Sequence, residues 1–145
     1  MHAALVQARA GATIGEMPVG AVVVRAGAII ASAHNETVAR RDPTAHAELL
    51  VMQRALQHGG AGRLTDTTLY VTLEPCAQCA GAIVLSKVGR VVYGARDDKA
   101  GMAGSVADLL RHASLNHHPE VWGGVLAEEC GALLRGLFEK RRAER

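Results

Sequence analysis

Two short motifs hold the residues of this sequence that are best suited to chemistry. The first is His46 with Glu48 two positions later, and the second is Cys76 and Cys79, preceded by Pro75. Because the cysteines are three residues apart, both thiols can lie on one face of a first helical turn, where the helix dipole favours thiolates. Two thiolates and an imidazole suit zinc and leave a fourth tetrahedral position open for water. The motifs therefore predict a catalytic metal site.

Glu48 is predicted to act beside this metal and not on it. It stands two residues beyond His46, which is about 200° around an ideal helix, so it is poorly placed to bind the same ion. A carboxylate next to an activated water can take its proton and later deliver protons to a ring nitrogen and a leaving amine. H-x-E followed by P-C-x-x-C is the signature of the zinc nucleobase deaminases. The order of residues therefore predicts deamination of a base.

The cysteine pair also has other interpretations. A C-x-x-C motif alone occurs in redox pairs and as half of a structural zinc site. A closed structural site would need a further ligand such as Cys130, which is better explained as a small buried side chain. The chain has three cysteines, an odd number, and this argues against a disulfide framework.

Length and composition predict one globular domain spanning residues 1–145. The chain is 49% hydrophobic, which is ample for a core. No apolar run approaches the roughly 20 residues of a membrane helix, and the start lacks a signal-like segment, so we expect a cytoplasmic protein that binds no membrane. A net charge of +2 neither demonstrates nor rules out nucleic-acid binding.

Hydrophobic periodicity and turn residues place the two motifs at the starts of helices. A strand–helix–strand alternation around the second motif favours a parallel strand pair. A glycine-rich loop at 100–104 is expected to lead into a helix that ends at His112. The other predicted helices are residues 1–12, 45–58, 76–86 and 125–142, and the predicted strands are residues 18–25, 28–34, 68–73 and 90–94.

Longer stretches around the motifs resemble the bacterial tRNA-specific adenosine deaminases of the cytidine deaminase-like superfamily. They are D-P-T-A-H-A-E at residues 42–48, T-L-Y-V-T-L-E-P-C at residues 68–76, and G-A-R-D at residues 94–97 followed by Lys99. The zinc signature is shared by the whole superfamily, whereas these stretches favour the tRNA enzyme. The resemblance covers nearly the whole chain.

This resemblance implies a fold, an activity and partners. The fold would be a three-layer α/β/α arrangement with a five-stranded mixed sheet, and the protein would be a homodimer with one zinc ion per subunit. The activity would be hydrolytic conversion of adenosine to inosine at the wobble position of a tRNA anticodon. The basic C-terminal residues 140–145 would help to hold the tRNA, although the same residues also suit a solvated helix end.

The resemblance also implies roles for individual residues. His46, Cys76 and Cys79 would hold zinc, and Glu48 would shuttle protons. The remaining assignments concern the substrate: the backbone of Ala47 and the side chain of Asn35 would touch the flipped base, Val19 and Pro43 would form the pocket wall, and Arg96, Asp97 and Lys99 would contact the anticodon loop.

The sequence departs from the family in two places. Gln78 stands between the cysteines where the family commonly has Met, which leaves the substrate preference open. The family's usual acidic and aromatic leader is absent, so a true start upstream of Met1 is also open. We expect His112, His117 and His118 to be loop or surface residues.

Two other functions remain as alternatives. One is a deaminase of a free base or nucleoside, such as guanine, cytosine or cytidine, because the zinc chemistry is common to them all. The other is a non-catalytic, zinc-stabilised partner subunit, for which loss of the Glu48 carboxylate would be expected. Glu48 is present.

Overall fold

The computed structural model describes residues 1–59 and 61–145, and strands alternate with helices along most of it. The strands are β1 (Gly20–Arg25), β2 (Ala28–His34), β3 (Thr67–Leu73), β4 (Arg90–Ala95) and β5 (Glu120–Trp122). The helices are α1 (His2–Thr13), α2 (Ala47–Leu56), α3 (Ala77–Ser86) and α4 (Ala127–Ala143). Among the described residues, no helix is both long and apolar enough to cross a membrane.

The strands form one mixed sheet in the order β2-β1-β3-β4-β5. β1 pairs antiparallel with β2 and with β3, whereas the β3–β4 and β4–β5 pairs are parallel. The predicted five-stranded mixed sheet and its parallel pair are therefore confirmed. Because of these directions, β2, β3 and β4 all end at the edge of the sheet where β1 begins, so residues from four segments meet there.

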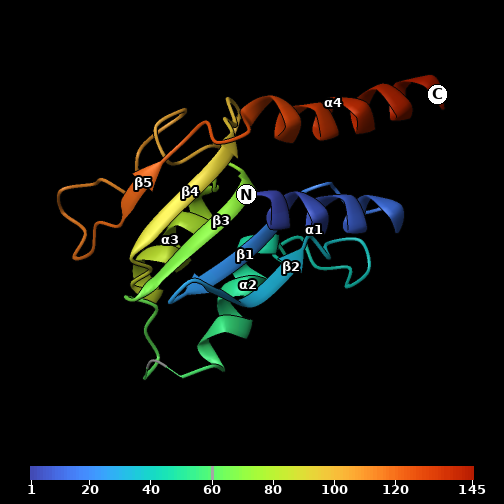
Figure 1. Cartoon of the computed structure of the whole chain (residues 1–145). Coiled ribbons are helices and arrows are strands. Elements are labelled where there is room, and N and C mark those ends of the chain that lie inside the picture. Colours follow the sequence, from blue (N-terminus) through green and yellow to red (C-terminus); the bar gives the residue numbers. More distant parts are fainter. Residues whose placement is uncertain (60) are drawn as a thin grey trace.

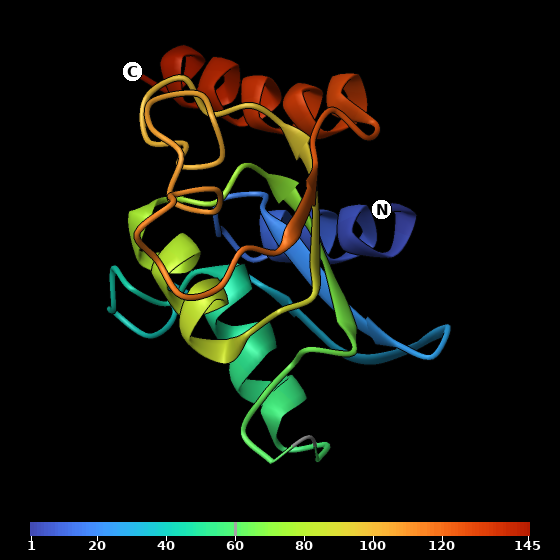
Figure 2. The same ribbon diagram turned by 90° about the vertical axis from the view of Figure 1, so that its left-hand side faces the viewer.

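Helices cover both faces of the sheet and give the predicted three layers (Figures 1 and 2). α2 and α3 pack on one face, where the main apolar cluster includes Val51, Leu69 and Ile83. α1 and α4 lie on the other face, where Leu5 and Cys130 form a smaller cluster. Gly20 allows this layer to approach closely, because a Cβ there would overlap backbone atoms of α1.

The hairpin between β1 and β2 forms where it was predicted. Its turn residues Ala26 and Gly27 both have positive φ angles, 50° and 78°, which match the twist of a tight hairpin. The predicted helices and strands before residue 100 are confirmed, with ends that move by one or two residues.

The helix predicted to end at His112 is wrong. Residues 101–112 form turns and an isolated bridge between Ala103 and Asp108. The Asp108 carboxylate accepts a hydrogen bond from the Arg111 backbone N–H, and Gly104 has a φ of 126°. Such local side-chain bonds compete with a helix, and this glycine conformation interrupts one. The short strand β5 was not located by the sequence.

Candidate metal centre and base cavity

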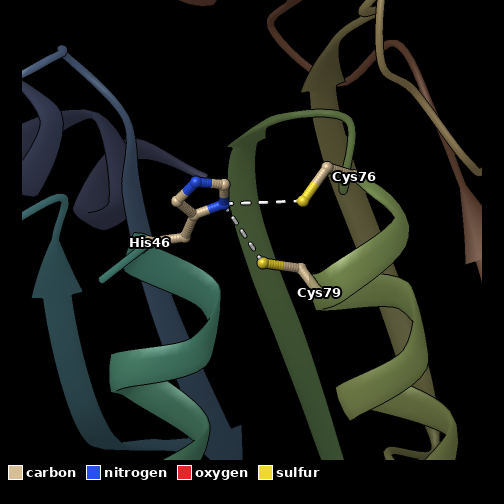
Figure 3. Close-up of side chains that lie close together, drawn as sticks. All are labelled: His46, Cys76 and Cys79. Carbon is tan, nitrogen blue, oxygen red and sulfur yellow. Dashed lines mark hydrogen bonds between the residues drawn. The ribbon is translucent and has the colours of Figure 1, made fainter. Parts of the chain in front are cut away.

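The starts of α2 and α3 bring the two chemical motifs together. His46 and Cys76 are the N-cap residues of these helices, and both have extended backbone conformations. Cys79 lies in the first turn of α3. The His46 ring therefore points across to both thiols (Figure 3). The partial positive charge of the helix N-termini favours a thiolate at Cys76, whereas the neighbouring Cys76 and burial raise the pKa of Cys79 in the metal-free site.

The distances within this group fit a tetrahedral metal ion. His46 Nδ1 lies 3.5 Å from Cys76 Sγ and 3.5 Å from Cys79 Sγ. All three candidate ligand atoms lie within 4.8 Å of one another. Ordinary zinc–nitrogen and zinc–sulfur bond lengths at a tetrahedral angle give a nitrogen–sulfur separation of about 3.6 Å. The three side chains could therefore hold one metal ion without rearrangement.

Electrostatics at the same site favour a metal-binding protonation state for Cys76. The adjacent Cys79 thiol and the His46 imidazole lower the pKa of Cys76 well below its usual value, even though partial burial opposes this. Cys76 in turn raises the pKa of His46. Metal ligands must be deprotonated, so the thiol that faces the imidazole is prepared for binding.

Glu48 lies beside the three ligands in the first turn of α2. Its side chain lines the same cavity as His46 and Cys76, but it is not part of the group of ligand atoms. Only 4% of Glu48 is exposed, and this burial raises its pKa from 4.5 to about 7, although the His46 charge opposes the shift. A carboxyl group with such a pKa can both accept and return a proton near neutral pH.

A cavity of about 170 Å³ opens at the sheet edge next to these residues. It lies where strand ends converge, which is a common location for ligand sites in α/β sheets. Pockets for whole drug-sized ligands are about 300–1,000 Å³, so this one has room for a single flat group. The lining residues are Met17, Val19, Asn35, His46, Glu48, Leu73, Glu74, Cys76, Asp97 and Ala100.

Known proteins match this chain over almost its entire length. A sequence profile of the MafB19-like deaminases matches residues 1–142. The tRNA-specific adenosine deaminase of Bacillus subtilis (strain 168) is 47% identical over all of this chain and 90% of the relative. The chain belongs to the tRNA-specific adenosine deaminase family.

Solved structures agree with this family assignment. A structure from work on A-to-I editing by tRNA:A34 deaminases at the wobble position of transfer RNA matches with a TM-score of 0.88 and 40% identity, and the match covers 92% of this chain and 97% of that one. A guanine deaminase from Nitrosomonas europaea has a TM-score of 0.79 and 27% identity, over 92% of this chain and 79% of its own. The fold is therefore shared with free-base deaminases, whereas the identity is higher to the tRNA enzymes.

Asn35 follows β2 directly and presents its amide side chain beside the metal ligands. Its Oδ1 accepts a hydrogen bond of 2.8 Å from the Ala47 backbone N–H, and its own N–H donates to Val19 carbonyl oxygen. Asn35 and Val19 both line the cavity, and their contacts with a substrate stay a prediction. Ala47 does not line it, because its N–H is engaged by Asn35 and the residue is fully buried. Ala47 thus acts on the cavity through the orientation of Asn35.

The other predicted substrate residues are more dispersed. Asp97 lines the cavity, whereas Pro43 is exposed and lies outside it. Arg96 and Lys99 border an adjoining depression. As expected, His112 and His118 are exposed, and each histidine of this loop is bonded to backbone atoms away from the cavity.

The sequence did not single out four cavity residues. Leu73 and Glu74 lie within the T-L-Y-V-T-L-E-P-C stretch, directly before the second motif, so their proximity to Cys76 was the available signal. Met17 and Ala100 reach the cavity from loops, whose path no periodicity describes. Glu74 is the only charged member of these four.

Proposed function

We propose that this protein hydrolytically deaminates adenosine to inosine at the wobble position of a tRNA anticodon. The observation that carries the proposal is the ligand group of His46, Cys76 and Cys79 beside Glu48, in a base-sized cavity of a chain that is 47% identical to a tRNA-specific adenosine deaminase. In this reaction the oxygen of water bonds to C6 of adenine, the C6–N6 bond breaks, and ammonia leaves.

His46, Cys76 and Cys79 would hold one zinc ion per subunit. Two thiolates and one imidazole leave a position open, which distinguishes a catalytic site from a closed structural one. When bound, zinc supplies a Lewis acid that makes water nucleophilic near neutral pH. Cys130 is no candidate for a closing ligand, because it is buried against Gly94 on the other face of the sheet.

Glu48 would move the protons of the reaction. In its ionised form the carboxylate takes a proton from the attacking water, and it then delivers protons to the ring nitrogen N1 and to the leaving amine. In the metal-free site burial raises the pKa of Glu48 to about 7, which favours a carboxyl group that can both take and return a proton. The carboxylate is buried and lines the cavity, so it would face the substrate directly.

The shape of the cavity suits a base that has been flipped out of a loop. Nucleobase deaminases act on unpaired or extruded nucleotides, and only the base has to enter. Asn35 would hydrogen-bond the base, Val19 would pack against it, and the Ala47 backbone would keep Asn35 oriented. Pro43 would contact the neighbouring nucleotide at the cavity rim.

Two open depressions continue outward from the cavity toward α4, and they would accept the RNA backbone. The first, of about 360 Å³, shares Leu73 and Asp97 with the cavity. The second, of about 450 Å³, shares Lys99 and Phe138 with the first. Cations recur along this path and suit phosphates. They are Arg96, Lys99, Arg141, Arg142 and Arg145.

We also propose a cytoplasmic homodimer. Leu85 on α3 is 80% exposed, and Trp122 on the edge strand β5 is 56% exposed. Large exposed apolar side chains and an open strand edge favour contact with a second copy. The native mass of the purified protein tests this assignment.

The decisive experiment measures inosine in a defined RNA. The purified, zinc-loaded protein is incubated with a transcript of an adenosine-wobble tRNA, and the digested RNA is analysed for inosine, with free adenosine, cytidine and guanine in parallel. Inosine at the wobble position alone supports the proposal. Deamination of a free base with unchanged tRNA would preserve the metal chemistry and overturn the substrate.

Metal analysis of the same preparations tests the ligand set. A Cys76→Ser protein should bind much less zinc, because a hydroxyl is a poor replacement for a thiolate ligand. Full zinc occupancy in this variant would contradict the proposed ligands. Absence of any turnover in a zinc-loaded protein would instead favour the partner-subunit alternative.

A further inference from the structure

Glu74 is the most deeply buried charged group on the cavity wall, and the reaction does not use it. It follows β3 and precedes Pro75 and the metal ligand Cys76, and it is 2% exposed. Glu74 Oε2 accepts hydrogen bonds from the backbone N–H groups of Ala103 (2.9 Å) and Ser105 (3.1 Å). Oε1 accepts from the Asp97 N–H (3.2 Å) and from the Ser105 hydroxyl.

These donors all come from one loop, residues 97–105, which follows β4. No Lys, Arg or His side chain within the described residues forms an ion pair with Glu74. Burial by itself raises the pKa of Glu74, but the bonds from Ser105, Ala103 and Asp97 outweigh it and bring the pKa below its usual value. Both oxygens of the Glu74 carboxylate are therefore satisfied by donors from this one loop.

The loop is shaped around this carboxylate. A Cβ at Gly101 would overlap the Glu74 carboxylate, so the backbone there passes directly against it. The Met102 N–H donates to the Pro75 carbonyl (2.8 Å), which ties the loop to the segment that carries Cys76. Asp97 Oδ1 accepts from the N–H groups of Lys99 and Ala100, so the turn that begins at Asp97 is also fixed.

The same loop supplies one wall of the cavity and the border of the adjoining depression. Asp97 and Ala100 line the cavity, and Arg96 and Lys99 line the depression. Arg96 also donates from Nε to the Ser105 hydroxyl at 3.1 Å. Ser105 therefore connects the buried Glu74 carboxylate to a cation at the surface. Asp97, Ala103 and Ser105 of this segment bond Glu74 directly, so bonds that converge on Glu74 hold the wall.

We propose that Glu74 is a positioning residue that holds residues 97–105 in place as the substrate-binding wall. This role rests on the proposed function, since it concerns how tightly the RNA is bound and not how the amine is removed. A change that loosens the wall removes binding interactions common to substrate and transition state, which raises KM and leaves kcat nearly unchanged. A role through Cys76 would instead lower metal content and kcat.

The test compares three variants with the unsubstituted protein. Glu74→Gln keeps the shape but turns an amide NH2 toward backbone donors, and Ser105→Ala removes one donor and leaves the carboxylate. Thr67→Val is the matched control: Thr67 is 4% exposed and its hydroxyl donates to Leu64 carbonyl oxygen at 2.7 Å, at the opposite end of β3. Each protein is assayed for zinc content, KM and kcat on the tRNA transcript, and amide hydrogen exchange.

Glu74→Gln should raise KM about tenfold, with kcat within about threefold and full zinc content, and Ser105→Ala should raise KM about threefold. Amides of residues 97–105 should exchange faster in Glu74→Gln than in Thr67→Val. Unchanged KM and unchanged loop exchange would overturn the proposal, and so would a loss of zinc that accounts for the activity. If Glu74→Gln fails to fold, Ser105→Ala decides in the same way.

A failure of the proposed function can be told apart from a failure of the role proposed for Glu74. It would appear in the unsubstituted protein, as tRNA without inosine, before any variant is compared. The exchange measurement uses no substrate, so it still decides whether Glu74 holds the wall.

Discussion

Two buried glutamates line one cavity and behave in opposite ways. Glu48 is 4% exposed and Glu74 is 2% exposed. Burial raises the pKa of Glu48 to about 7, whereas hydrogen bonds bring the pKa of Glu74 below its usual value despite burial. The two residues therefore show that burial does not fix the charge of a carboxyl group, because the number of donors that face it decides the outcome.

The difference follows from where each residue stands in the chain. Glu48 lies in the first turn of α2, so its neighbours are the thiols and the imidazole of the ligand group, and few N–H groups point at it. Glu74 lies between β3 and α3 and faces a loop whose backbone N–H groups donate to it. The first environment suits proton transfer, and the second suits a fixed anchor.

The largest effect is expected from Glu48→Gln. The amide keeps the size of the side chain but cannot take a proton, so kcat for inosine formation should fall by about 10³-fold, within the range typical of general acid–base catalysis. Zinc content should stay unchanged, because Glu48 is not a ligand. The measurement is single-turnover inosine formation together with metal analysis. Glu74→Gln under the same assay should retain most of its kcat, and equal losses of kcat in the two variants would remove the distinction between them.

The second prediction concerns the stability of the metal-free protein as a function of pH. The folded-state pKa of Glu48 is raised from 4.5 to about 7, so the native state binds its proton more tightly than the unfolded state. The resulting stabilisation is fully present below pH 4.5 and is lost as the pH rises through 7. The loss is worth at most about 3 kcal/mol relative to Glu48→Gln.

Urea unfolding of both proteins between pH 4 and pH 9 measures this difference. The free energy of unfolding of the unsubstituted protein should fall relative to that of Glu48→Gln across the interval from about pH 4.5 to 7. Parallel curves would show that Glu48 has an ordinary pKa in the fold.

Sequence patterns located Glu48 but not the role of Glu74, because the two roles depend on residues at different distances along the chain. The His46–Glu48 and Cys76–Cys79 spacings are local, and the signature H-x-E with P-C-x-x-C joins the two motifs although they lie 30 positions apart. The donors to Glu74 come from residues 97–105, more than twenty positions later, and this loop has no periodicity. The predicted helix ending at His112 failed for a local reason, since the Asp108 carboxylate accepts a bond from the Arg111 backbone N–H and Gly104 has a φ of 126°.

The strand order could also be predicted in part from the sequence, whereas the loop residues at the edge of the cavity could not. Strand–helix–strand alternation predicted the β3–β4 pair, because such a connection favours parallel neighbours. The path of Met17 and Ala100 to the cavity depends on how loops pack against the finished sheet, which no short pattern encodes. The exposure of Pro43, which was predicted to form the pocket wall, was likewise visible only in the structure.

The third prediction reverses the pH dependence of the second. The pKa of Glu74 is lowered in the fold, so its stabilisation is present above the ordinary value of 4.5 and is lost as the pH falls through the folded-state pKa. Glu74→Gln should lower the free energy of unfolding by about 2 kcal/mol near neutral pH, because buried donors lose a charged acceptor. The gap between the two proteins should narrow below pH 4.5, as measured by urea unfolding from pH 7 to pH 3. A gap that widens in acid would contradict the assigned charge of Glu74.

The smallest effect is expected from Gln78→Met. Gln78 Nε2 donates to the Thr44 carbonyl oxygen at 2.9 Å, and this exposed bond links the start of α3 to the segment that precedes His46. A single neutral hydrogen bond that water can replace is worth about 1 kcal/mol or less, so the free energy of unfolding should change by no more than that, with zinc content unchanged. Thermal unfolding of the zinc-loaded variant measures it. If Gln78→Met lowered the free energy of unfolding as much as Glu74→Gln does, an exposed bond between the two ligand-bearing segments would stabilise the fold as much as a buried one. The contrast between Glu48 and Glu74 would then need a different explanation.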